Sequence, residues 1–208
     1  MKSKILNGFF LLGLAYFSYL LLLISLQYIP FSSDVAFLRI KMDQVQLPYY
    51  IVSFKAHVFT SFFLLIAGFT QFSKWIRTQY RQLHRWMGWS YISILLLFSA
   101  PSGLVLGWHA NGGWMSQLAF IILGVLWIYF TIQALRFAIK KDWTKHRNFM
   151  IRSYALTLSA ISLRLFKYLI VFIWHPLPMD TYRIVAWLGW VVNLIIAEII
   201  IHKKARVV

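Results

Sequence analysis

WMSQLAFIILGVLWIYFTIQALRFAI, residues 114–139, contains one charged side chain, Arg136. A helix needs about 20 mostly apolar residues to cross the hydrocarbon core of a bilayer. The stretch is longer than that. It begins at Trp114 and is followed by Lys140 and Lys141, and such aromatic and cationic residues are favoured at headgroup depth. The sequence therefore predicts a transmembrane helix here.

Five further stretches have the same character, so the chain is predicted to cross the membrane six times, at residues 8–29, 50–72, 86–108, 114–139, 149–174 and 182–201. The composition agrees, because 61% of the residues are hydrophobic and only 12% are charged, whereas soluble domains carry about 25% charged residues. We therefore predict an all-α, polytopic membrane protein. It forms a single transmembrane domain, residues 1–208, with a central four-helix bundle made by the second to fifth spans.

Lysine and arginine are distributed unevenly between alternate loops. Most of the 21 lie in four groups next to the first, second, fourth and sixth spans: Lys2, Lys4, Lys74, Arg77, Arg81, Arg85, Arg136, Lys140, Lys141, Lys145, Arg147, Arg152, Lys203, Lys204 and Arg206. The opposite loops hold only Arg39, Lys41, Lys55 and Arg183. Cytoplasmic loops carry such an excess, so both termini are predicted to be cytoplasmic. The net charge of +16 then indicates attraction to anionic lipid headgroups and not nucleic-acid binding, for which no soluble surface is present.

Two histidines occupy matched positions at the cytoplasmic starts of the third and fifth spans. His84 and His146 lie on different helices at the same predicted depth. Neutral imidazole is a common ligand of haem iron and of other metals. The pair therefore favours a haem b held between helices, although both rings could instead meet lipid phosphate in a basic interfacial cluster. The absence of cysteine excludes disulfides, thiolate ligands and iron–sulfur clusters.

A third histidine, His57, lies inside the second span among apolar residues. Ionisable groups inside a membrane are costly and are therefore functional candidates. We expect His57 to act in cofactor binding or proton handling, or else to form a polar contact with a serine or threonine of a neighbouring helix. His109 and His175 lie in or beside loops and are its candidate partners.

The fifth span carries three cations, Arg152, Arg164 and Lys167, which fall within about 120° of a helical wheel. Arg152 and Lys167 can extend to opposite interfaces, but Arg164 is too deep to do so. Arg164 is therefore expected to face an internal polar site, such as a water-filled cavity, a haem propionate, a carboxylate or a phosphate. The alternative is a clamp on backbone carbonyls at a kink near Pro101.

Glu198, the only glutamate in the chain, lies in the cytoplasmic part of the last span. It could pair with Arg152 or Lys203. It could also complete a metal site with His84 and His146, because two histidines and one carboxylate are a known ligand set for iron or zinc.

Several of these residues belong to short motifs that follow one another along the chain: Gly68-x-x-Gln71, His84-Arg85-Trp86-x-Gly88-x-x-Tyr91, Pro101-Ser102-Gly103, His146-Arg147, Arg152-Ser153-Tyr154, Thr157, Leu163-Arg164, Asn193 and Glu198. In this order they resemble a bacterial multi-pass membrane-protein family catalogued as domain of unknown function 2306 (DUF2306). The resemblance covers residues 50–200 and implies a place in the bacterial cytoplasmic membrane, but no established activity.

The chain is also loosely similar to the transmembrane di-haem cytochromes b, which have six spans and use histidines on successive helices as axial ligands. In that comparison His57, His84, His109 and His146 follow a similar progression, but His109 lies in a loop. The likeness implies one haem, at His84 and His146, and rests on analogy of fold.

Three functions remain open. The first is electron transfer by a haem-b protein that acts with a redox partner and binds its cofactor through His84, His146, His57, Arg152 and Arg164. The second is transport or binding of a quinone or an anion in an arginine-lined cavity. The third is assembly or scaffolding, with polar residues that only lock helix packing. Sequence motifs of soluble enzymes, such as a Walker loop or HExxH, are absent. Enzymatic activity stays open, and the haem-b hypothesis would make the protein a membrane oxidoreductase.

Overall fold

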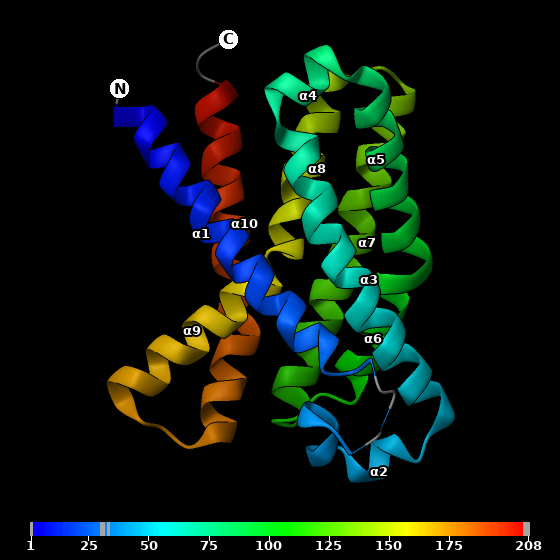
Figure 1. The fold of residues 1–208 in the computed structure, drawn as a ribbon, viewed down its shortest axis with the longest axis vertical. Coiled ribbons are helices and arrows are strands. Elements are labelled where there is room, and N and C mark those ends of the chain that lie inside the picture. Colours follow the sequence, from blue (N-terminus) through cyan, green and yellow to red (C-terminus); the bar gives the residue numbers. More distant parts are fainter. Residues whose placement is uncertain (1, 30–31, 33, 206–208) are drawn as a thin grey trace.

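The computed structural model describes residues 2–29, 32 and 34–205, and within these residues the chain forms helices and no strand (Figure 1). The helices are α1 (Lys2–Leu26), η1 (Ala36–Ile40), α2 (Met42–Val45), α3 (Pro48–Phe72), α4 (Lys74–Gln79), α5 (Arg81–Ile94), the π-helical turn η2 (Leu95–Ser99), α6 (Ala100–Trp108), α7 (Trp114–Ile139), α8 (Trp143–Thr157), α9 (Ser159–Trp174) and α10 (Pro178–Ala205). The all-α prediction is confirmed. Arg206 lies outside the described residues.

Four continuous stretches of helix are long and apolar enough to cross a membrane: Pro48–Phe72, Arg81–Trp108, Trp114–Ile139 and Pro178–Lys203. A fifth crossing is made if α8 and α9, which meet at 43°, count as one broken span. The apolar helix described within α1, Ala15–Leu26, is shorter than these. The chain is therefore a multi-pass membrane protein, whereas the count of six spans and the orientation stay predictions.

Both ends of the chain lie on the same side of the molecule as α4, and α2 lies on the opposite side (Figure 1). We refer to these sides as the α4 end and the α2 end. The connections from α6 to α7 and from α9 to α10 lie at the α2 end, and that from α7 to α8 lies at the α4 end. Successive long helices thus alternate in direction, as the predicted topology requires.

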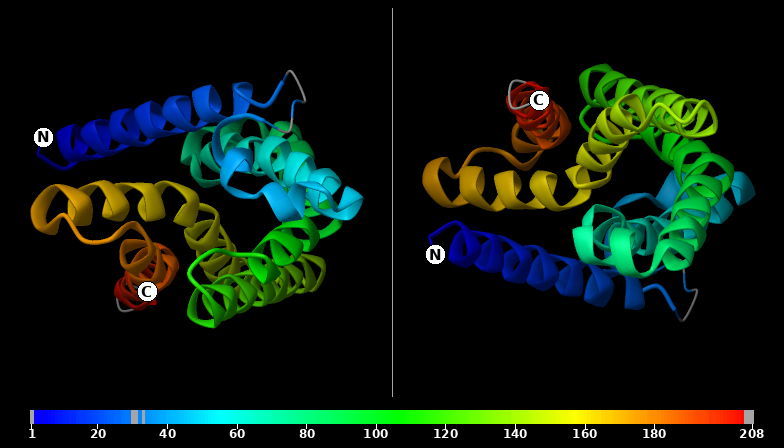
Figure 2. Two further views of the ribbon diagram at one scale, coloured as in Figure 1. Left: turned by 90° about the horizontal axis from the view of Figure 1, so that it is seen from below. Right: turned by 90° about the horizontal axis from the view of Figure 1, so that it is seen from above.

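The core of the molecule joins the predicted four-helix bundle to α10. Its buried residues come from α3, α5, η2, α6, α7 and α8, with Trp190 added from α10. Helix α1 packs against α3, and both views in Figure 2 show α1 and α9 projecting from the same side of the bundle. A bundle of α3, α5–α6, α7 and α8 is therefore present, whereas α9, the second half of the predicted fifth span, projects from it, and α10 belongs to its core as well.

A closed ring of hydrogen bonds connects α5, α7 and α8 inside this core. Successive distances are 3.2 Å from Trp127 Nε1 to Thr157, 2.8 Å from Thr157 to the Tyr91 hydroxyl, 2.9 Å to Ser153 and 2.7 Å to Thr131, whose hydroxyl donates to the Trp127 carbonyl at 2.7 Å. One placement of the hydrogens satisfies every donor in turn. A fully satisfied buried network makes helix packing specific, so we assign a structural role to these residues.

The bend between α8 and α9 is stabilised by Asn193 of α10. Its amide nitrogen donates to the carbonyl of Ala155 at 3.0 Å, and its amide oxygen accepts from the Ser162 hydroxyl at 2.9 Å. A helix that breaks within a membrane needs such partners for the backbone groups that it frees. Asn193 therefore holds one residue on each side of the bend, which directs the start of α9 toward the interior.

Candidate functional site

A cavity of about 410 Å³ lies between α1, α3, α6, α7, α9 and the first turns of α10. Apolar side chains make most of its wall, and its polar and titratable lining residues are Ser25, Tyr28, Lys41, Tyr50, His57, Ser61, His109, Trp127, Thr157, Ser159, Arg164 and Tyr182. We call it the central cavity. Its charged lining residues are Lys41 and Arg164, and no described lining residue is an aspartate or a glutamate.

Arg164 reaches the cavity from the second turn of α9, just after the bend. One guanidinium nitrogen donates to the carbonyl of Ala160 on its own helix at 2.7 Å. Among the described residues the ion pairs are formed by other arginines and lysines, so Arg164 has no carboxylate partner there. The expected clamp on carbonyls near Pro101 is not the contact observed. The remaining guanidinium donors are available to a bound group.

His57 lies in the cavity wall on α3, and its ring has a defined tautomer. Nδ1 is 2.9 Å from the carbonyl oxygen of Ser99, which only accepts, so Nδ1 carries the hydrogen and donates it. Ser99 ends the π-helical turn η2, and Pro101, which has no backbone N–H, follows it. A Cβ at Gly103 would lie 3.0 Å from Cε1 of His57, so this glycine makes room for the ring. The Ser99 carbonyl, which also accepts from the Ser102 hydroxyl at 3.1 Å, thus orients His57, and the kink near Pro101 stays a prediction.

Lys41 and His109 form the wall of the cavity at the α2 end. The ammonium group of Lys41 donates to the backbone carbonyl of His109, and the Tyr49 hydroxyl is 3.1 Å from His109 Nε2. The Lys41 side chain is only 3% exposed, and this burial lowers its pKa because the charged form loses hydration. A second buried cation therefore faces the same cavity as Arg164.

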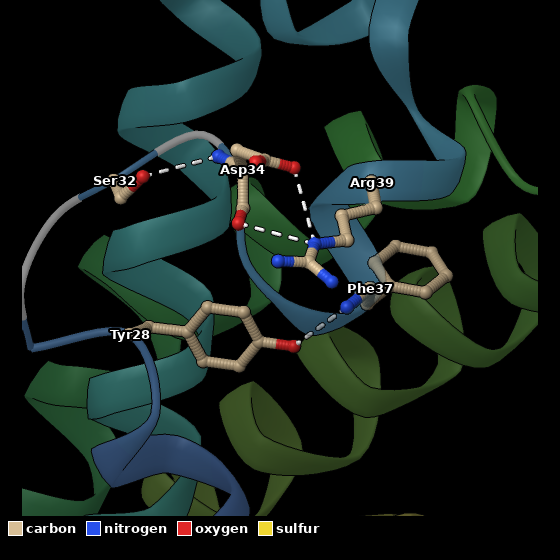
Figure 3. Close-up of polar contacts among 5 residues, drawn as sticks. All are labelled: Tyr28, Ser32, Asp34, Phe37 and Arg39. Atoms are coloured by element: carbon tan, nitrogen blue, oxygen red, sulfur yellow. Dashed lines mark hydrogen bonds and ion pairs between the residues drawn. The ribbon is translucent and has the colours of Figure 1, made fainter.

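Polar contacts join residues within the connection from α1 to α2 to one another (Figure 3). The Tyr28 hydroxyl accepts from the backbone N–H of Phe37 at 3.3 Å, and both residues line the cavity. Nearby, Nε of Arg39 is 3.1 Å from the Asp34 carboxylate and also donates to its carbonyl, while the Ser32 hydroxyl accepts from the Asp34 N–H. These contacts hold η1 against the α2 end of the cavity.

His84 and His146 are brought together at the α4 end, where each lies within electrostatic reach of the other. Nδ1 of His146 donates to the carbonyl of Ala134 at 2.9 Å, which leaves Nε2 as an acceptor. Nδ1 of His84 is buried and has no hydrogen-bond partner among the described residues. Neither ring lines the central cavity, so haem binding between them is not supported.

Glu198 is engaged by Arg152 and not by the two histidines. Nε and one terminal nitrogen of Arg152 donate to its two carboxylate oxygens at 2.5 and 2.8 Å. In the described part of the chain no group of three or more His, Cys, Asp or Glu side chains could hold a metal ion. The predicted metal set of His84, His146 and Glu198 is therefore not assembled.

Two other predicted site residues lie away from the central cavity, and one lies on it. Lys167 is exposed on α9. His175 is exposed at the end of α9 in a left-handed conformation, with φ of 48°. His109 lines the cavity. Sequence reasoning missed Lys41 and Tyr182 as lining residues. Lys41 lies in a predicted connection and Tyr182 at the start of a predicted span, and neither position distinguishes a cavity residue from an interfacial one.

Several residues of the motifs that resemble the DUF2306 family lie at contacts between helices. A Cβ at Gly68 would lie 1.7 Å from the Tyr154 ring, and the Tyr154 hydroxyl donates to the carbonyl of Leu65 at 3.1 Å. Gln71 donates to the carbonyl of His84 at 3.1 Å, and a Cβ at Gly88 would lie 3.1 Å from the Gln71 amide oxygen. These residues explain the close packing of α3 against α5 and α8.

A family sequence model described as "Predicted membrane protein (DUF2306)" matches residues 54–201, which is more than half of the chain. No curated protein and no solved structure was found to match. The likeness to di-haem cytochromes b thus gains no support. The region that the family model matches contains His57, Arg164, His84 and His146.

Proposed function

We propose that this protein, which belongs to the DUF2306 family of predicted membrane proteins, binds a small amphipathic anion in its central cavity. The observation that carries the proposal is the charge of the wall, where Lys41 and Arg164 face the same space and no described lining residue is acidic. The function is thus that of a small-molecule binding protein, and the same site could serve a transporter.

The cost of burying these charges favours an anionic ligand. An arginine in the centre of a membrane helix costs about 2.5–3.5 kcal/mol on insertion scales, and more in simulations. Arg164 has one backbone carbonyl as its protein partner, which does not neutralise it. A carboxylate or a related planar anion could accept two parallel hydrogen bonds from the guanidinium group, and this would offset the cost.

The rest of the wall favours an amphipathic molecule. Leucine, isoleucine, valine and phenylalanine form the largest group of lining residues, so a hydrocarbon body would be buried away from water. The volume of about 410 Å³ lies within the roughly 300–1,000 Å³ of small-molecule sites. A quinone has the apolar body but not the charge, so an anion fits the two cations better.

The proposal includes the topology predicted from the charge pattern, with six spans in one domain, residues 1–208, and both termini in the cytoplasm of a bacterium. It is supported by the basic residues of α4, such as Lys74 and Arg77, which lie at the same end as both chain ends (Figure 1). The anion would then lie nearer the outer face. Anionic headgroups of the inner leaflet would meet the α4 end.

The test compares two charge deletions on one helix. Arg164→Met removes the cation from the cavity, and Lys167→Met removes an exposed cation three residues away. The probe is 4-butylbenzoate, titrated calorimetrically into protein in nanodiscs of zwitterionic lipid. Loss of charged hydrogen bonds should weaken binding about ten- to hundredfold in Arg164→Met, whereas Lys167→Met should stay within about twofold.

Equal affinities of the two variants would contradict the proposal, and so would the absence of saturable binding to the wild-type protein. The second result would favour a scaffold. A visible spectrum of the purified protein tests the haem proposal separately, because a Soret band that disappears in His84→Ala would restore electron transfer as the function.

A further inference from the structure

We infer that the anion is a weak oxygen acid of the carboxylic acid class, and that it is bound together with one proton shared between its oxygen and Nε2 of His57. This inference rests on the proposed function. It names the class of ligand and assigns His57 as a second protein partner of that ligand, in addition to Arg164.

The first step is the fixed polarity of His57. Because Nδ1 donates to the Ser99 carbonyl at 2.9 Å, the neutral ring presents Nε2 as an acceptor. No hydrogen bond to Nε2 is formed by the residues that the structure describes, although the ring lines the cavity. The π-helical turn and Gly103 hold the ring in this orientation. His57 is therefore a prepared acceptor without a partner.

The second step is complementarity with Arg164, which can only donate. The two side chains line the same cavity and lie within electrostatic reach. A ligand that satisfies both must offer an acceptor oxygen to Arg164 and an O–H group to His57. A single carboxylic acid group has both. A sulfonate, which is ionised at all ordinary pH values, has acceptor oxygens only.

The third step concerns the proton. The titratable groups that share the cavity wall with His57 and Arg164 are Tyr28, Lys41, Tyr50, His109 and Tyr182. None of them is a carboxylic acid, so protonating His57 without an anion would add a further buried cation. A carboxylic acid is ionised in water above a pH of about 4.3. At neutral pH the carboxylate and one proton therefore enter together, and the proton lies between the ligand oxygen and Nε2.

The experiment uses two probes with the same hydrocarbon body, 4-butylbenzoate and 4-butylbenzenesulfonate, and the full-length protein in nanodiscs at pH 7. Titrations in two buffers of different ionisation enthalpy report the number of protons taken up. We expect the wild-type protein to take up about one proton per benzoate. It should also bind benzoate about five- to tenfold more tightly than the sulfonate, as expected for one hydrogen bond.

The informative variant is His57→Asn, because the asparagine amide can still donate to Ser99 but offers no acceptor in the place of Nε2. It should lose the proton uptake and the preference for benzoate, and keep its affinity for the sulfonate. His175→Asn is the matched control. His175 is exposed outside the cavity, and asparagine tolerates its left-handed backbone. It should behave as the wild type.

The outcomes separate the two ideas. If both probes bind and depend on Arg164, but no proton is taken up or His57→Asn weakens both equally, the inference is wrong and the proposed function stands. If neither probe binds the wild-type protein, the proposed function fails first.

Discussion

Gly68 shows how the absence of one side chain sets the distance between α3 and α8. The ring of Tyr154 occupies the place of a Cβ at this position, and its hydroxyl reaches the Leu65 carbonyl one turn away. Gly68→Ala should destabilise the protein by about 1–3 kcal/mol, as overpacking of a core does. Thermal unfolding in mild detergent measures this change.

The matched control is Gly13→Ala in α1, where an added Cβ would meet nothing within 4 Å. That variant should unfold at the wild-type temperature or slightly above it, because alanine favours helix over glycine. The double variant Gly68→Ala, Tyr154→Leu should recover part of the lost stability. A Gly68→Ala protein as stable as the Gly13→Ala protein would show that the ring can move aside.

The functional candidates that could be predicted from the sequence are residues of a type that is rare inside membrane spans. His57 and Arg164 are ionisable groups inside apolar stretches, and both line the central cavity. Lys41 was not predictable, because a lysine in a connection is ordinary until the fold buries it. The contacts that bury it come from His109, far away in the sequence.

At the scale of the helices, Asn193 of α10 stabilises the bend between α8 and α9. Replacing Asn193 by leucine leaves the Ala155 carbonyl and the Ser162 hydroxyl without this partner. A buried group that loses its hydrogen bond costs about 1–3 kcal/mol, so Asn193→Leu should lower thermal stability. Because the bend directs Arg164, the affinity for 4-butylbenzoate should fall as well.

Asn193→Asp provides the comparison, since it keeps the acceptor for Ser162 and, when protonated, offers an O–H group in place of the amide donor to Ala155. If the side chain acts through the bend, its effect on benzoate affinity should be smaller than that of leucine at pH values where the acid is protonated. Unchanged affinity in Asn193→Leu would show that the position of Arg164 does not depend on this clamp.

Element boundaries were predictable where apolar residues run without interruption. The predicted span at 114–139 coincides with α7. The predicted span at 149–174 is two helices that meet near Leu158, and no proline or glycine near Leu158 signals the break. The bend depends on a tertiary contact from α10, which hydrophobic periodicity does not contain. The π-helical turn at Leu95–Ser99 is different, because Pro101, which lies two residues beyond it, marks an irregular helix in the sequence.

At the scale of the whole molecule, the basic residues of alternate loops predict which loops lie on the same side of the membrane. The long helices alternate in direction, and this places the same loops at the same end of the molecule (Figure 1). These are independent properties, since one depends on composition and the other on packing. What neither provides is the central cavity. It forms where α1, α3 and α9 meet, and spans this far apart in the sequence carry no pattern that reports their contact.

The absence of cysteine makes the topology directly testable, because a single introduced thiol has no background. Arg39→Cys and Asp180→Cys place exposed thiols at the α2 end, and Lys145→Cys and Lys203→Cys place exposed thiols at the α4 end. If the positive-inside pattern sets the orientation, a membrane-impermeant maleimide should label the first pair in intact cells. The second pair should react only after the membrane is opened. A labelled Lys145→Cys in intact cells would show an inverted topology and place the anion site toward the cytoplasm, whereas protection of Arg39→Cys alone would contradict the predicted crossing by α3.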